Sequence, residues 1–195
     1  MAELLLIRHF ATKGNLEGRY IGVTDEPICR EAVLGRAWYG KFPVEQVFVS
    51  PLRRCIQTAG IVFPGVGQTI VSELRECDFG EFENHNYREL AEHPDYQRWV
   101  ESQGTLPFPG GEQPQVFRDR CRQGFLKSVE SMKKLRMECC ALVVHGGTIM
   151  SILEAFGQPK RDFYDWQIKN GEGFLLEFSW ESWLENGRMR VIENL

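Results

Sequence analysis

Three short, largely apolar runs constrain the fold of this chain more than any other feature. They are Leu4 to Ile7, Val44 to Val49 and Ala141 to Val144. Such runs are typical of strands that are covered on both faces of a parallel sheet. The second and third runs are followed by segments with apolar residues at helical spacing, 53–63 and 148–156. Strand followed by helix, repeated along one chain, predicts an α/β sheet sandwiched by helices.

Two further helices are expected at 87–99 and 115–134. Between them, the Pro- and Gly-rich segment 107–111 is interpreted as an ordered loop, because it is short and both its flanks carry apolar residues. Towards the end of the sequence, strands at 173–180 and 188–192 flank Asn186-Gly187, which favours a hairpin. The sheet should therefore be mixed, with an antiparallel edge. A length of 195 residues fits a single domain over 1–195.

Composition excludes several classes of protein. The chain has 23 Lys and Arg against 27 Asp and Glu, a formal charge of -4, so a general nucleic-acid-binding surface is not expected. No apolar run reaches the ~20 residues of a membrane-spanning helix. The first residues resemble no export signal, and six cysteines are scattered without a C-x-x-C pair. We expect a soluble, cytoplasmic protein with reduced, mostly structural thiols.

Candidate functional residues follow directly after the three expected strands. Arg8 and His9 follow the first strand, Arg53 and Arg54 lie shortly after the second, and His145 follows the third. In open α/β sheets, ligands bind outside the carboxyl ends of the strands. Each of these residues alone would more often have a structural role. Together they predict two histidines and up to three arginines at one edge of the sheet.

This combination favours a phosphoryl ligand, because guanidinium groups match its oxygens in pairs and stay charged. The Gly146-Gly147 turn, opening a helix, adds N–H donors at the positive end of the helix dipole. A neutral imidazole can attack phosphorus and form a phosphohistidine. The departing oxygen needs a proton, which a carboxylic acid can supply. Candidate acids cluster in one stretch, for which a solvated acidic loop is the alternative interpretation: Glu73, Glu76, Asp78, Glu81 and Glu83.

Other phosphate chemistries lack their signatures in this sequence. The chain has no G-x-x-x-x-G-K-[ST] loop, no Cys followed six residues later by Arg, no D-x-D and no G-x-S-x-G elbow. Its four histidines show no metal-ligand spacing, and His85 and His93 are expected at the surface of a helical region. We expect no metal and no other cofactor.

Four motifs, in order, resemble those of the histidine phosphatase superfamily. Arg8 to Asn15 is similar to R-H-G-x-T-x-x-N, Ser50 to Arg54 to S-x-L-x-R, and Leu74 to Gly80 to L-x-E-x-x-x-G, while His145 to Gly147 resembles the second-histidine motif. The matches span nearly the whole chain. The resemblance implies a three-layer α/β/α sandwich with a mostly parallel mixed sheet, as in phosphoglycerate mutases.

By position, the resemblance implies that His9 is the nucleophile and Glu76 the proton donor. Arg54 is preferred over Arg53 because it stands four residues after Ser50, as the motif requires. The remaining phosphate-pocket residues implied are Arg8, Asn15, His145 and Gly146. Two positions depart from the family pattern, because Phe10 and Asn84 stand where glycine is usual. Phe10 raises the question of its backbone conformation and of whether its ring narrows the pocket.

Within the family that the chain resembles, its motifs favour a phosphatase over a mutase. Trp99 is followed by Val100-Glu101 and not by the consecutive arginines with which mutases hold a substrate carboxylate. Segments 18–22 and 108–112 resemble those of smaller phosphatases, including α-ribazole phosphatases. The implied reaction is hydrolysis, with α-ribazole 5′-phosphate as the first substrate to test. The alternatives are a phosphoglycerate mutase-type phosphotransferase and a non-catalytic phospholigand-binding protein in which Phe10 blocks attack.

Substrate selection is expected from Arg19 and Tyr20 and from a cap at about 81–114. The expected partner is a small phosphorylated metabolite, with neither nucleic acid nor membrane involved. The sequence leaves open whether the chain forms a homo-oligomer.

Overall fold

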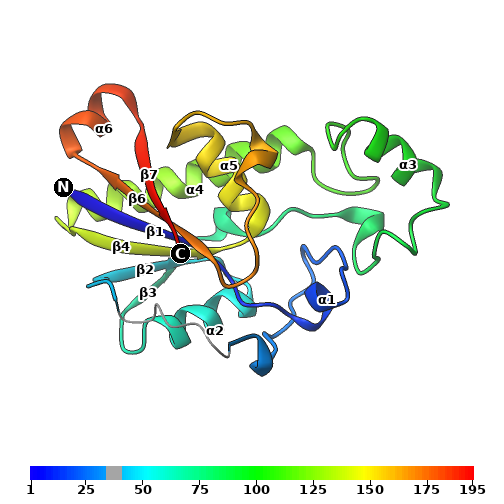
Figure 1. Ribbon diagram of the computed structural model, residues 1–195, viewed down its shortest axis with the longest axis horizontal. Coiled ribbons are helices and arrows are strands. Elements are labelled where there is room, and N and C mark those ends of the chain that lie inside the picture. Colours follow the sequence, from blue (N-terminus) through cyan, green and yellow to red (C-terminus); the bar gives the residue numbers. More distant parts are fainter. Residues whose placement is uncertain (34–40) are drawn as a thin grey trace.

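The computed structural model describes residues 1–33 and 41–195 and is built around one mixed sheet (Figure 1). The described strands are β1 Ala2–Arg8, β2 Gln46–Val49, β3 Gln68–Ile70, β4 Cys139–Val144, β5 Gly157–Gln158, β6 Gly173–Phe178 and β7 Met189–Asn194. Their order across the sheet is β3-β2-β4-β1-β6-β7-β5. Strands β1 to β4 pair in parallel, and the three predicted central strands are confirmed.

Helices cover both faces of this sheet (Figure 1). The described α-helices are α1 Lys13–Leu16, α2 Arg53–Val62, α3 Pro94–Glu101, α4 Pro114–Lys134, α5 Gly146–Phe156 and α6 Trp180–Asn186. Short 3₁₀ turns occupy η1 Arg30–Val33, η2 Ser72–Leu74, η3 Gly80–Phe82 and η4 Phe163–Trp166.

Side chains alternate between the two faces along β1. Leu4 and Leu6 lie in the apolar cluster shared with α4 and α5, and Leu5 and Ile7 in the cluster shared with α2. Both faces are thus buried, which explains why residues 4–7 of the strand are all apolar. The predicted three-layer α/β/α sandwich is confirmed. None of the helices in the described ranges is long and apolar enough to cross a membrane.

The helix expected at 87–99 is only partly correct. The structure places turns at 87–92, and α3 begins at Pro94 and ends at Glu101. Proline suits the first helical position but forces the preceding residue to be extended, so His93 caps the helix and the helix cannot start earlier. The Asn86 side chain accepts hydrogen bonds from the backbone of Arg88 and Glu89, which fixes a turn instead.

The hairpin expected at Asn186-Gly187 is wrong, although the two strands do pair. Strands β6 and β7 are antiparallel, but α6 connects them, capped by Ser179 at its start and by left-handed Gly187 at its end. The expected antiparallel edge is also wrong. β6 runs opposite to both β1 and β7 inside the sheet, and β7 pairs in parallel with β5.

Residues 80–113 extend beyond the carboxyl ends of the strands, with α3 far from the sheet (Figure 1). The loop predicted at 107–111 packs against η3, where the amide of Glu81 donates to the carbonyl of Pro109 (2.8 Å). A Cβ added to Gly80 would come within 2.1 Å of that carbonyl oxygen, so this close approach requires glycine. The segment is therefore a folded extension beside the strand ends.

Candidate active site

His9 follows β1 and is buried, with 3% of its surface exposed. Its Nδ1 lies 2.7 Å from the carbonyl oxygen of Phe10. A carbonyl can only accept, so Nδ1 carries the ring proton and Nε2 keeps a free electron pair. Burial, followed by the positive charges of Arg54 and Arg8, holds the pKa of His9 well below its usual range. The imidazole is therefore neutral and nucleophilic at Nε2.

Phe10 supplies that carbonyl without straining the chain. Its backbone is not left-handed; the described non-glycine residues that are left-handed are Asn84, Gln103 and Arg136. Its ring is fully buried in the apolar cluster beneath α2, and its amide donates to Thr58 Oγ1 (3.0 Å). The ring therefore packs in the core and does not narrow the pocket. Asn84, the other departure from the family pattern, keeps the φ of +62° that glycine usually adopts.

His145 follows β4 and faces His9, with the two ring centroids 5.2 Å apart. Its Nδ1 accepts a hydrogen bond from Arg54 Nε (3.3 Å), since a guanidinium can only donate. The ring proton then lies on Nε2, which donates to Ser50 Oγ (2.7 Å). Burial and the charge of Arg54 lower the pKa of His145 well below its usual range. Both histidines of the pocket are neutral.

Arg54 lies in the first turn of α2 and is completely buried. Besides its bond to His145, it donates from Nη1 to the carbonyl of Thr24 (2.7 Å) and from Nη2 to those of Ile21 (3.3 Å) and Gly22 (2.8 Å). Arg54 thus ties the 21–24 loop to the pocket and places a positive charge beside both histidines. Arg53, the neighbouring candidate, is exposed.

Arg8, at the end of β1, keeps donors available for a ligand. Its Nη1 donates to the carbonyl of Ile168 (2.6 Å), but its buried Nε has no hydrogen-bond partner among the described residues. A Cβ added to Gly146 would lie 3.3 Å from the Arg8 guanidinium carbon. The helix α5 therefore begins directly against this guanidinium, where its first N–H groups add positive potential.

Glu76 lies after η2 and is buried, with 8% exposed. Its Oε1 accepts from the amide of Cys77 (3.0 Å) and its Oε2 from the amide of Gly147 (3.3 Å). Burial raises the pKa of this carboxyl, although the Cys77 hydrogen bond, Arg54 and Arg8 oppose the shift. A Cβ at Gly147 would come within 2.7 Å of Oε1, so glycine leaves room for the carboxyl. The expectation of a solvated acidic loop does not hold at this residue.

Asn15 is linked to the backbone of His9 through Asn170. Its side-chain oxygen accepts from the amide of Thr12 and from Asn170 Nδ2, each at 3.2 Å. The same Asn170 nitrogen lies 3.1 Å from the carbonyl oxygen of His9. Asn15 therefore belongs to the network that fixes the backbone of His9.

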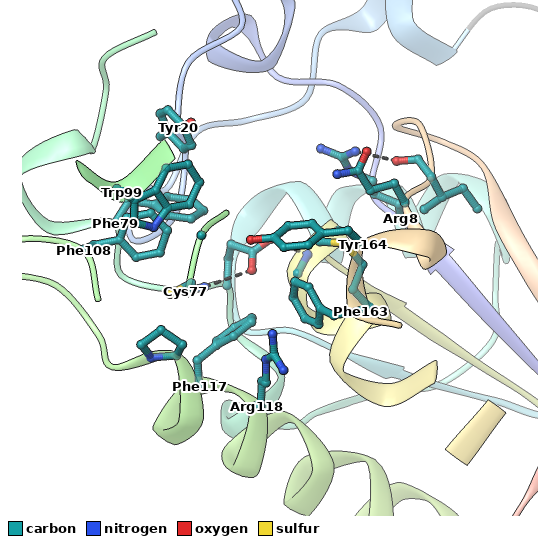
Figure 2. A pocket seen from close by; sticks show the side chains of 18 residues that line it. Arg8, Tyr20, Cys77, Phe79, Trp99, Phe108, Phe117, Arg118, Phe163 and Tyr164 are labelled. Atoms are coloured by element: carbon teal, nitrogen blue, oxygen red, sulfur yellow. Dashed lines mark hydrogen bonds between the residues drawn. The ribbon is translucent and has the colours of Figure 1, made fainter. Parts of the chain in front are cut away.

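A cavity of about 450 Å³ opens beside Arg8, Glu76, Gly146 and Gly147 (Figure 2). Two groups of aromatic side chains line it. One comes from the 20–108 part of the chain and contains Tyr20, Phe79, Trp99 and Phe108; the other comes from α4 and η4 and contains Phe117, Phe163 and Tyr164. Arg118 lies at its wall, over the Phe163 ring (4.2 Å to the centroid) and paired with Glu154 (3.1 Å).

The two residues expected to select substrate have different surroundings. Tyr20 lines the cavity and packs edge-on against Phe79, with centroids 5.4 Å apart. Arg19 does not line it, because both terminal nitrogens of its guanidinium bind the Glu89 carboxylate (2.8 and 3.0 Å). Sequence reasoning missed the Phe163 and Tyr164 wall. The only signal for this wall in the sequence is an aromatic pair after an expected helix. That pair does not indicate where its side chains point.

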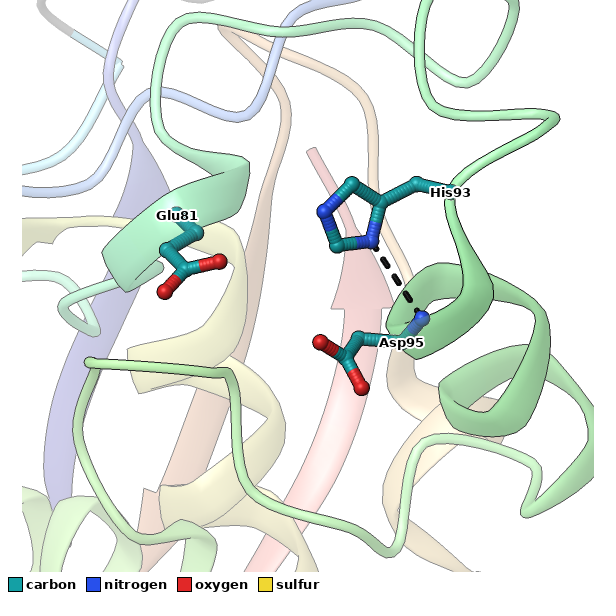
Figure 3. Close-up of side chains that lie close together, drawn as sticks. All are labelled: Glu81, His93 and Asp95. Carbon is teal, nitrogen blue, oxygen red and sulfur yellow. Dashed lines mark hydrogen bonds between the residues drawn. The ribbon is translucent and has the colours of Figure 1, made fainter.

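A trio in the 81–95 region gathers one histidine and two carboxylates: Glu81, His93 and Asp95 (Figure 3). His93 Nδ1, however, accepts the amide hydrogen of Asp95 (3.2 Å) and so caps α3. The same electron pair cannot also bind a metal. The absence of a metal cofactor stays a prediction.

Known proteins that are similar in sequence to this chain include two phosphatases. The chain is 30% identical to phosphoserine phosphatase 1 of Hydrogenobacter thermophilus, over 66% of this chain and 64% of that protein. It is 28% identical to an adenosylcobalamin/α-ribazole phosphatase of Salmonella typhimurium, over 87% of both chains.

Solved structures with the same fold include both enzyme classes. A phosphoglycerate mutase of Thermus thermophilus is 28% identical, with a TM-score of 0.72 over 99% of this chain and 98% of that one. An α-ribazole phosphatase of Shigella flexneri, 22% identical, shares the fold with a TM-score of 0.79 over 92% of both chains. The family model described as histidine phosphatase superfamily (branch 1) matches residues 4–186, and the chain therefore belongs to that superfamily.

Proposed function

We propose that this protein hydrolyses a phosphomonoester of a small molecule through a phosphohistidine on His9. The observation that carries the proposal is the hydrogen bond from His9 Nδ1 to the Phe10 carbonyl, which leaves Nε2 as a free nucleophile beside Arg8 and His145. In the first step, Nε2 forms a bond to phosphorus while the P–O bond to the alcohol breaks. Arg8 and Arg54 balance charge on the phosphoryl oxygens, and neutral His145 is assigned to the same oxygens as a hydrogen-bond donor through Nε2.

Glu76 is assigned the proton transfers. In its protonated form it donates to the departing alcohol, and as a carboxylate it then accepts a proton from the water that attacks the phosphohistidine. The raised pKa of Glu76 keeps the acid form present to higher pH, while the lowered pKa of His9 keeps the nucleophile neutral to lower pH. The two shifts widen the pH window in which both groups have the required protonation state.

The cavity supports a leaving alcohol with a large, flat, apolar body. Its aromatic walls adjoin Glu76, where the alcohol oxygen departs. A cation at the cavity wall, Arg118, is paired with Glu154. α-Ribazole 5′-phosphate fits this description and is the first substrate to test. A mutase reaction would need free cations for a substrate carboxylate, and Val100-Glu101 supplies none. The non-catalytic alternative rested on obstruction by Phe10, whose ring is buried in the core.

The test is hydrolysis of p-nitrophenyl phosphate in excess EDTA, followed by a panel of phosphomonoesters that includes α-ribazole 5′-phosphate. Labelled phosphate should be trapped on the protein in an acid-labile, base-stable form, and His9→Ala should abolish both trapping and turnover. Full activity of that variant would remove the scheme. Phosphate binding without turnover would support the non-catalytic alternative, and bisphosphoglycerate-dependent interconversion of phosphoglycerates would support the mutase.

A further inference from the structure

An ion pair lies beside the pocket, between Arg120 of α4 and Glu112 of the preceding loop. Arg120 Nε lies 2.7 Å from Glu112 Oε1, and Nη2 lies 2.6 Å from Oε2. The side chains are 10% and 12% exposed. Burial lowers the pKa of Arg120, but its bonds to Glu112 outweigh that effect and raise it. The pair is thus a charged, two-point contact shielded from water.

The remaining donors of Arg120 all bind the segment that carries Glu76. Nη1 donates to the carbonyls of Glu73 (2.9 Å) and Arg75 (2.6 Å), and Nη2 donates to the carbonyl of Glu76 itself (2.9 Å). Together with the two bonds to Glu112, these contacts use all five N–H groups of the guanidinium. Lysine, with three donors on a flexible stem, cannot reproduce this planar arrangement.

The same segment is held from its other side by the loop that contains Glu112. The amide of Glu112 donates to the carbonyl of Asp78 (2.9 Å), and a Cβ at Gly111 would come within 2.5 Å of that oxygen. Glu76 lies outside the described strands and helices, so no sheet or helix ladder fixes its backbone. Arg120 and Glu112 supply that constraint.

We propose that Arg120, oriented by Glu112, is a positioning residue that holds Glu76 where its carboxyl meets the leaving oxygen. This inference rests on the proposed function. All five N–H groups of Arg120 bind protein groups, so it acts through Glu76 and has no donor left for a substrate. Loss of the contact should therefore weaken proton donation and leave the attack by His9 nearly unchanged. A displacement of the acid by about 1 Å can cost roughly 10²-fold in rate.

The experiment compares a phosphomonoester with an alkyl leaving group and p-nitrophenyl phosphate, which needs little proton donation. Arg120→Lys should lower kcat on the alkyl ester by about 10- to 100-fold and on p-nitrophenyl phosphate by less than about 3-fold. Glu112→Gln should show the same pattern more weakly. In a Glu76→Gln background, Arg120→Lys should add no further loss on the alkyl ester. The basic limb of the pH dependence of kcat on the alkyl ester, where Glu76 loses its proton, should also shift in Arg120→Lys.

Lys127→Met is the matched control, because Lys127 lies on the same helix and pairs with Glu73 through side chains alone. It should change neither rate by more than about 2-fold. Equal losses on both esters in Arg120→Lys and Glu112→Gln, or a full additional loss in the Glu76→Gln background, would overturn the positioning role. If Glu76→Gln itself slowed both esters equally, the proton-donor assignment of the proposed function would fail instead.

Discussion

At the scale of single residues, one neighbour decides the state of each pocket histidine. The Phe10 carbonyl fixes the proton of His9 on Nδ1, and the Arg54 guanidinium forces the proton of His145 onto Nε2. The identities of these residues were predictable, because each follows a strand in the sequence. The tautomer of His145 was not, since the bond from Arg54 to His145 joins residues 91 positions apart. Such contacts depend on packing that no local pattern encodes.

The Phe10 ring is expected to contribute to the stability of the protein and not to its chemistry. Phe10→Gly restores the residue usual in the family but deletes a fully buried ring from the cluster beneath α2. Loss of a buried Phe side chain costs about 3–5 kcal/mol, and glycine adds backbone entropy to the unfolded chain. The free energy of unfolding, measured in urea, should fall by about 4 kcal/mol. The rate on p-nitrophenyl phosphate, measured well below the unfolding temperature, should change less than about 3-fold, because the carbonyl remains.

Phe10→Leu is the control, since it keeps an apolar side chain and should lose much less stability. A Phe10→Gly protein that unfolded at the same urea concentration as the parent would contradict the packing described for this ring. One that was stable but inactive would show that the ring itself supports the nucleophile.

At the scale of elements, the sequence predicted the buried strands and the helices α2, α4 and α5, where apolar spacing dominates. It failed where capping residues decide the outcome. Pro94 delays α3, and Ser179 caps α6 at the end of the strand that was expected over 173–180. The dipeptide Asn186-Gly187 favours a hairpin turn, but Gly187 at φ +61° serves equally well as a left-handed helix cap. The local preference of this dipeptide is the same for a hairpin turn and for a helix end, and only tertiary packing distinguishes the two structures.

Two glycine substitutions test this assignment together. Gly187→Ala should destabilise the protein by about 1 kcal/mol, because the added Cβ meets no neighbour but the left-handed backbone strains it. Gly60→Ala should stabilise by about 0.5–1 kcal/mol, since Gly60 lies in α2 with no left-handed φ and its Cβ would meet only Gln68 Nε2 at 3.7 Å. Thermal unfolding measures both. Opposite signs are expected, and equal signs would refute one of the two conformations.

At the scale of the whole molecule, the site has two parts with different origins. The phosphate pocket lies at the carboxyl ends of β1, β2 and β4, whose positions follow from a repeated strand and helix pattern. The aromatic cavity needs Tyr20, the segment that carries Phe79, the α3 region, α4 and η4, brought together at one cavity (Figure 2). The first part was predictable from strand order. In the second part, Tyr20 and the cap at 81–114 were expected, but the walls from α4 and η4 were not, because their residues share no spacing and converge only through the fold.

This division predicts separable effects on chemistry and on substrate size. Trp99 packs against Phe108, with centroids 5.2 Å apart, and its buried Nε1 has no hydrogen-bond partner among the described residues. Trp99→Leu should raise KM about tenfold for a phosphomonoester with an aromatic body, a loss of about 1.4 kcal/mol. KM for glycerol phosphate, too small to reach this wall, should stay within about 2-fold.

Tyr87→Leu is the matched control, because Tyr87 belongs to the same extension but is 57% exposed and does not line the cavity. It should alter neither KM. An equal rise for both esters in Trp99→Leu would mean that Trp99 holds the phosphate pocket closed and does not contact the leaving group. The selectivity of the cavity would then come from the η4 wall. The phosphate pocket and the aromatic cavity would also depend on each other structurally, since both border Glu76.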